Sequence, residues 1–263
     1  MFSRHLKNTL MFNWKDCYVG YLNMDSRTDR LAHINEQLPK LKIPFYRTRG
    51  QLPSEFDRND PNLQVQWNRT PGSIGCMYGQ MAIMAKAWIE GKSAMVFEDD
   101  CELCSDIKIR LNYLGEFLNK QENWDVAWLG GTVHLNPPYW HMENNPDLPN
   151  TKLRVDAERT SDPRIVKCYG AFCTYAYIVR YESIVKVLSL LQSVMVESMG
   201  IDWSFIRLGD QLDTFMFLPG MVKQIDNMSS IGHGMTIFSG FLKLGPYVYQ
   251  DKVEDFDLST YNW

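Results

Sequence analysis

The sequence predicts an α/β fold, in which helices cover both faces of a central sheet, and three observations support this prediction. Residues 94–97 form an apolar run without alternation, which is typical of a strand covered on both faces. The segment before this run carries apolar residues at helical spacing. A strand, a polar turn and a helix are also predicted near the amino terminus, and similar alternation continues along the chain, as in α/β domains.

Composition predicts a globular protein with a sizeable core. The chain has 263 residues, of which 45% are hydrophobic. Its net charge of −4 gives no overall attraction for nucleic acid or an anionic membrane. No apolar run reaches the roughly 18 residues that span a bilayer, and the amino end lacks the apolar region of a signal peptide. We therefore expect a cytoplasmic protein whose six cysteines are reduced.

The first predicted unit is a strand at residues 17–24, which are rich in β-formers. A helix follows, with a buried face at three- and four-residue spacing, made of Leu31, Ile34, Leu38 and Leu41. The turn between them carries Asp25, Arg27 and Arg30. These side chains suit contacts with a ribose and with phosphate, although such turns are commonly caps and surface ion pairs.

A second strand is expected at residues 43–48, followed by a polar, proline-containing loop at 52–68. The helix before residues 94–97 is predicted from one apolar face, made of Ile74, Met77, Met81, Met84 and Trp88.

Three acidic residues, Glu98, Asp99 and Asp100, directly follow the apolar strand. A hard cation such as Mg²⁺ or Mn²⁺ would offset their repulsion, because it prefers oxygen ligands. A solvated turn, or a cap for a helix that begins near Asp106, is the alternative. Open α/β sheets bind ligands at the carboxyl ends of their strands, which favours the metal.

The rest of the chain continues the pattern. Apolar spacing predicts helices over 107–118 and 184–195, and residues 124–129, 167–180 and 213–219 are expected to be strands. Asp202 opens a short helix, where it could act as a cap. Residues 132–163 lack periodicity and are expected to form an ordered loop. Candidate ligand contacts in this loop are His134, Tyr139, Trp140 and His141.

The motif TPGSIGC at residues 70–76, followed by a hydrophobic strand and EDD, resembles glycosyltransferase family 25. Residues 21–30 (YLNMDSRTDR) are similar to the family's amino-terminal pattern, and Asp202 matches the position of a functionally important Asp. The resemblance extends from about residue 18 to residue 233. The chain departs from it at Gly79-Gln80, where many members have Ser-His.

The resemblance implies a GT-A glycosyltransferase fold with a Rossmann-like mixed central sheet flanked by helices. It implies a single domain over 1–263, with a nucleotide-sugar half at about 14–131, an acceptor half at about 132–240 and a tail at 241–263. The expected reaction is an inverting transfer from a UDP-sugar to a hydroxyl group of a glycan or glycoprotein. No nucleic acid and no transmembrane segment is expected, and peripheral membrane contact stays open.

The resemblance also assigns roles to residues of this chain. Asp202 would be the general base. Mn²⁺ or Mg²⁺ would be held by Asp100, with Glu98 and His233 as further candidates. The expected donor contacts are Asn23, Asp25, Arg27, Arg30, Glu98 and Asp99.

Two other functions are compatible with these features. One is a sugar-nucleotide or glycan binding protein on the same fold that has lost catalysis, for which Gln80 is the hint. The other is a metal-dependent nucleotidyltransferase, which would usually show a Gly/Lys-rich phosphate loop that is not found in this sequence. The transferred sugar and the acceptor are not specified.

Overall fold

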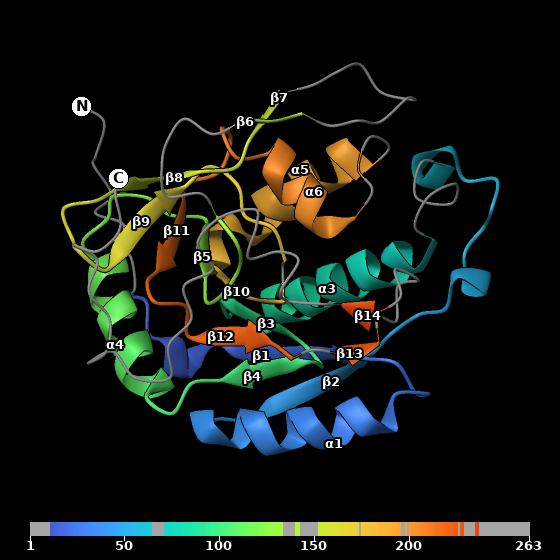
Figure 1. Cartoon of the computed structure of the whole chain (residues 1–263), viewed down its shortest axis with the longest axis horizontal. Coiled ribbons are helices and arrows are strands. Elements are labelled where there is room, and N and C mark those ends of the chain that lie inside the picture. Colours follow the sequence, from blue (N-terminus) through green and yellow to red (C-terminus); the bar gives the residue numbers. More distant parts are fainter. Residues whose placement is uncertain are drawn as a thin grey trace, which may run out of the picture.

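An eight-stranded mixed sheet forms the centre of the computed structural model (Figure 1). Its order is β2 (Phe45–Arg49), β1 (Tyr18–Asn23), β3 (Ala94–Glu98), β10 (Ala176–Val179), β5 (Val126–Trp128), β11 (Thr214–Phe217), β9 (Ile165–Cys168) and β8 (Ala157–Arg159). The structure describes residues 11–64, 71–133, 153–173, 175–195, 198 and 200–225, and the backbone alone of 140–142, 152, 227–228 and 235–236.

The strand directions place one set of carboxyl ends at a common edge of the sheet. β1 pairs in parallel with both β2 and β3, and β5 pairs in parallel with β11. β10 lies between β3 and β5 and is antiparallel to both. β1, β2, β3, β5 and β11 therefore all end at the same edge, and the predicted mixed α/β architecture is confirmed.

Helices cover both faces of this sheet, which makes three layers (Figure 1). One face packs against α1 (Thr28–Gln37) and α4 (Ile107–Leu118), and the other against α3 (Pro71–Ile89), α5 (Ile184–Val194) and α6 (Ile201–Arg207). Alternate side chains of β3 point to the two cores: Ala94 and Val96 to one, Met95 and Phe97 to the other. This explains why the strand is apolar at every position.

Helix α3 packs very closely against β1. A Cβ atom added at Gly20 would overlap the Ile83 side chain, and one added at Gly79 would overlap Leu22. Ile74, Met77 and Met84 are fully buried, as their spacing predicts. Trp88 was expected on the same face, but it is 48% exposed. Residues 88–92 are all exposed, so the end of the helix extends beyond the packed layer.

The segment 167–180, expected to be one long strand, forms two strands that are not neighbours. β9 and β10 lie apart in the sheet, with β11 and β5 between them. The chain leaves the sheet between them: Gly170 packs against the Arg154 carbonyl, and Cys173 has a left-handed φ of 67°. This turn returns Tyr175 to the end of β3, where its carbonyl accepts a bond of 2.8 Å from the Glu98 amide.

The segment 132–163 also differs from the expected loop, because it contains strands. β6 (Trp140–Met142) pairs with β7 (Lys152–Arg154), and β8 forms an edge of the main sheet.

The other elements are short: η1 (Trp14–Asp16), η2 (Leu38–Leu41), η3 (Pro53–Glu55), η4 (Pro61–Leu63), β4 (Cys101–Leu103), η5 (Tyr181–Ser183), β12 (Val222–Gln224), β13 (Asn227–Met228) and β14 (Met235–Thr236).

No helix in the part of the chain that the structure describes has the length and apolar character needed to cross a membrane. All six cysteines are free thiols. The predicted division into a nucleotide-sugar half and an acceptor half stays a prediction.

The close approach of α3 to the loop after β2 gives a stability test. A Cβ atom at Gly75 would overlap the backbone carbonyl of Gln51. Gly75→Ala should therefore lower the free energy of unfolding by about 1–3 kcal/mol, although alanine favours helices. Gly115→Ala in α4 is the matched control, since its nearest atoms are 3.9 Å away. Urea unfolding measures both, and an equal or higher stability for Gly75→Ala would contradict this packing.

Candidate functional site

The three acidic residues Glu98, Asp99 and Asp100, here called the acidic triplet, lie at the carboxyl end of β3. Glu98 is the last residue of the strand, and the two Asp residues form the turn before β4. Asp99 and Asp100 are only 6% and 2% exposed, so this is not a solvated turn. Neither caps α4, because β4 intervenes and α4 begins at Ile107.

The guanidinium group of Arg30, from the first turn of α1, lies against both aspartates. Its Nη1 is 3.1 Å from Asp99 Oδ1 and 2.9 Å from Asp100 Oδ2. Arg30 is 6% exposed, so the contacts are removed from water. The positive charge that makes two adjacent buried carboxylates tolerable therefore comes at least partly from Arg30.

Asp99 is held on both oxygens. In addition to Arg30, it accepts a hydrogen bond of 2.7 Å from Asn23 Nδ2. The Asn23 amide also donates to the Arg27 carbonyl, at 3.1 Å, and its Oδ1 accepts from Arg47 Nε at 3.0 Å. Arg47 thus fixes the orientation in which the Asn23 amide points its NH₂ group toward Asp99. We infer a structural role for Asp99 in orienting the turn.

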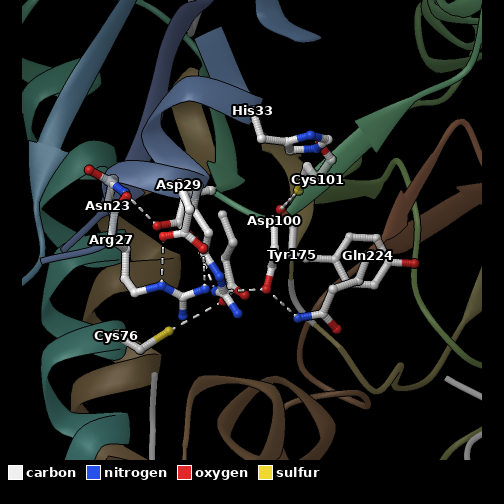
Figure 2. Close-up of polar contacts among 12 residues, drawn as sticks. Asn23, Arg27, Asp29, His33, Cys76, Asp100, Cys101, Tyr175 and Gln224 are labelled. Atoms are coloured by element: carbon white, nitrogen blue, oxygen red, sulfur yellow. Dashed lines mark hydrogen bonds and ion pairs between the residues drawn. The ribbon is translucent and has the colours of Figure 1, made fainter. Parts of the chain in front are cut away.

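Asp100 has one oxygen held and one oxygen available. Oδ2 accepts from Gln224 Nε2 of β12 at 2.9 Å (Figure 2). It also accepts from Arg30 Nη1 at 2.9 Å. Oδ1 is buried and has no hydrogen-bond partner among the described residues. Burial raises the pKa of Asp100, while the charge of Arg30 acts in the opposite direction. A buried carboxylate oxygen without a hydrogen bond lowers the stability of the fold unless a bound ligand supplies the missing contact.

Glu98 points toward α3. Its Oε1 accepts from Gln80 Nε2 at 2.8 Å and from the Cys76 thiol at 3.3 Å, and Cys76 is seen beside the cluster in Figure 2. Burial raises the pKa of Glu98 to about 8, and the charge of Asp100 adds to this effect. Both effects favour the protonated form of this carboxyl group.

Asp202 lies in the first turn of α6, where its Oδ1 accepts from the Trp203 amide at 2.9 Å. A Cβ atom added at Gly200 would lie 3.3 Å from Asp202 Oδ1 and 3.6 Å from Ser73 Cβ, so Asp202 is close to the first turn of α3. Cys76, one turn further along α3, donates to Glu98. Burial raises the pKa of Cys76, and the charges of Glu98 and Asp202 raise it further. Asp202 and Glu98 therefore lie near the same end of α3.

The remaining predicted donor contacts lie at the rim of the site. The Asp25 side chain is 59% exposed and is paired with Arg47 at 2.6 Å and Arg49 at 2.9 Å. These two bonds lower the pKa of Asp25. Arg27 is paired with Asp29 at 2.9 Å (Figure 2). Asp25 is therefore near solvent, and the Arg27 side chain is 17% exposed, whereas Asn23 and Arg30 contact the triplet itself.

Several predicted ligand contacts are not among the residues whose side chains the structure describes. His233, His134 and Tyr139 are outside the described residues, and only the backbone is described for Trp140 and His141. Among the described residues, no group of three His, Cys, Asp or Glu side chains is arranged to hold a metal ion.

Two features of this site are not predicted from the sequence. One is the role of Arg47, although Arg47 and Arg49 are two residues apart in β2 and so share one face of an edge strand. Gln80 was noted as a departure from a family pattern, but its bonds were not foreseen: it donates to Glu98, and its Oε1 accepts from the Tyr177 hydroxyl at 2.8 Å.

The fold and the site define an α/β protein with a ligand site at the carboxyl ends of parallel strands, where open sheets bind ligands. Residues 18–203 match the family model described as glycosyltransferase family 25 (LPS biosynthesis protein), and the chain belongs to this family. The matched region includes the acidic triplet and Asp202. A search of curated proteins gave no match. The protein is thus a glycosyltransferase by family, with a sugar donor and an acceptor as substrates.

The Arg30 contacts lead to a stability prediction. Arg30→Gln leaves two buried carboxylates without their cation, and it should lower the free energy of unfolding by about 3–5 kcal/mol at pH 7. Arg49→Gln is the matched control, because Arg49 pairs with acids at the surface and should change stability little. Denaturant unfolding of both variants measures the difference. Equal stabilities for the two variants would contradict the role given to Arg30.

Proposed function

We propose that the protein is a metal-dependent inverting glycosyltransferase of the GT-A type, which moves a sugar from a UDP-sugar to a hydroxyl group of a glycan or glycoprotein. The observation that supports this most directly is the buried Asp100 Oδ1, which has no partner among the described residues. It lies at the end of β3, beside the turn that carries Asp25 and Arg27.

The residues present fit a cation that is shared with the substrate. Mg²⁺ and Mn²⁺ are commonly bound by one or two carboxylates, with substrate phosphates and water completing the shell. Asp100 Oδ1 would be the ligand from the triplet, since both Asp99 oxygens already accept hydrogen bonds. His233 is a further candidate. The cation would neutralise the diphosphate as it leaves.

Asp202 is the proposed general base. It lies on α6, on the opposite face of the sheet from α1, which supplies Arg30. In an inverting transfer the acceptor hydroxyl attacks from the side opposite the leaving group. Asp202 meets this requirement because its helix and the helix that carries Arg30 cover opposite faces of the sheet. Removing the proton of the attacking hydroxyl in this way contributes on the order of 10²–10⁴-fold in rate.

The donor's nucleotide is proposed to lie along the carboxyl ends of β1 and β2. Asp25, which is exposed there, and Arg27 beside it would contact the ribose and the phosphate. Asn23 and Arg30 would contribute indirectly, by holding the carboxylates of Asp99 and Asp100 in place. The family description names lipopolysaccharide biosynthesis, so glycan acceptors are the first to test. We also propose a cytoplasmic location, in keeping with six free thiols.

Removal of the metal ligand is the first functional test. Wild-type protein should bind one UDP-sugar in the presence of Mn²⁺ and lose this binding in EDTA, measured by isothermal titration. Asp100→Asn should abolish the metal-dependent part of binding while the protein stays folded. Asp210→Asn, at an exposed position after α6, is the control. Unchanged binding by Asp100→Asn would rule out the metal assignment. A wild-type protein that binds donor but transfers no sugar would favour the non-catalytic alternative.

The base assignment has its own test. Asp202→Asn should bind the donor as tightly as wild type, because the amide keeps the size of the carboxylate, yet it should lose about 10²–10⁴-fold in kcat. Transfer is followed by release of UDP in the presence of acceptor. Asp210→Asn again serves as the control. Full transfer by Asp202→Asn would exclude this residue as the base.

A further inference from the structure

We propose that Gln80 and Tyr177 are positioning residues that fix the Glu98 carboxyl group for contact with the transferred sugar of the donor. This inference rests on the proposed function and deepens it, because it separates Glu98 from the metal site and assigns it to the sugar.

The two residues form a buried relay to Glu98. Gln80 lies in α3 and Tyr177 in β10, and both are fully buried. The Tyr177 hydroxyl donates to Gln80 Oε1 at 2.8 Å, and Gln80 Nε2 donates to Glu98 Oε1 at 2.8 Å. Cys76, one turn before Gln80, donates to the same Glu98 oxygen at 3.3 Å. Two donors from α3 thus meet at one oxygen of Glu98, and Tyr177 of β10 supports one of them.

Tyr177 sets the direction of the Gln80 amide. Its ring lies 5.5 Å from that of Trp128 and 5.4 Å from that of Phe205, so packing on two sides holds the hydroxyl in place. Burial raises the pKa of Tyr177 well above its usual range, and the hydroxyl therefore keeps its proton. A protonated hydroxyl that donates to the amide oxygen leaves the NH₂ group facing Glu98.

A polar relay at this position is not required for packing. Gln80 lies between Met77 and Met84 along α3, on the face that packs into an apolar core. An amide there is tolerated only because both of its ends are hydrogen-bonded. An apolar side chain of similar size would fill the same volume without that constraint. We therefore assign the Gln80 amide the role of holding Glu98, to which its NH₂ group donates.

Glu98 keeps its second oxygen for a ligand. Oε1 takes the bonds from Gln80 and Cys76, and Oε2 has no hydrogen bond among the described residues. Glu98 and Cys76 are partly exposed, whereas Gln80 is fully buried. Glu98 is therefore within reach of a ligand from solvent.

Glu98 lies near both proposed catalytic ends. It is two residues before Asp100, and Cys76 of α3, which donates to it, is one turn after Ser73. A Cβ atom added at Gly200 would lie 3.6 Å from Ser73 Cβ and 3.3 Å from Asp202 Oδ1, so Asp202 is close to the same end of α3. If the diphosphate binds at Asp100 and the acceptor hydroxyl at Asp202, the sugar being transferred lies between them. A carboxyl group in that space contacts the hydroxyl groups of the sugar.

Phe205 links this relay to the proposed base. It packs against Tyr177 and lies on α6, one turn after Asp202. The same tyrosine therefore positions Glu98 through Gln80 and contacts the helix that carries Asp202, so the sugar contact and the base share one rigid support.

The test compares binding of UDP, which has no sugar, with binding of the UDP-sugar that wild type prefers, both with Mn²⁺. Gln80→Leu and Tyr177→Phe should weaken UDP-sugar binding and lower kcat/KM by roughly tenfold each, the loss expected for one hydrogen bond. Their affinity for UDP should match that of wild type. Tyr78→Phe is the matched control, because its hydroxyl contacts Met195 and does not contact the relay.

The possible results separate this inference from the proposed function. Equal losses for UDP and UDP-sugar would show a general structural effect and overturn the inference, as would unchanged binding and transfer in both variants. Neither result affects the metal and base assignments. A wild-type protein that binds no UDP-sugar would overturn the proposed function, and the inference with it. If Gln80→Leu does not fold, Tyr177→Phe, which removes one oxygen atom, carries the test.

Discussion

The buried contact of Arg30 with Asp99 and Asp100 organises the site, because it makes two adjacent carboxylates tolerable away from water. A continuous set of polar contacts extends from it in both directions. On one side Asn23 and Arg47 connect Asp99 to the edge strand β2, and on the other Gln224 connects Asp100 to β12. The orientation of Asp100, and hence of its available oxygen, depends on elements from both ends of the described chain.

Close helix packing gives the site its second support. Gly20 and Gly79 allow α3 to lie directly on β1, which places Cys76 and Gln80 within reach of Glu98 at the end of β3. The three acids consequently have different surroundings despite being adjacent in sequence. Asp99 is saturated, Asp100 has one available buried oxygen, and Glu98 is tied to α3 and has a raised pKa. Different surroundings allow similar side chains to take different roles.

The departures from the predicted elements also matter for the site. Residues 167–180 contain β-formers almost throughout, so composition gave no sign that they form two separated strands, apart from Gly170. The turn between the strands brings Tyr175 to the end of β3, where its carbonyl accepts from the Glu98 amide. Trp88 is a second departure from the prediction. It continues the helical spacing of apolar residues in α3, but it is exposed because the sheet does not extend that far.

The sequence by itself determined the features that depend on neighbouring residues. Apolar spacing defined α1, α3, α4 and α5, the unbroken apolar run defined β3, and the family motifs located the acidic triplet and Asp202. Tertiary structure alone decided which side chains meet. Arg30 and Asp99 are 69 positions apart, Gln80 and Tyr177 are 97 apart, and Asp100 and Gln224 are 124 apart. Local patterns carry no information about such pairs, because strand order and helix packing bring them together.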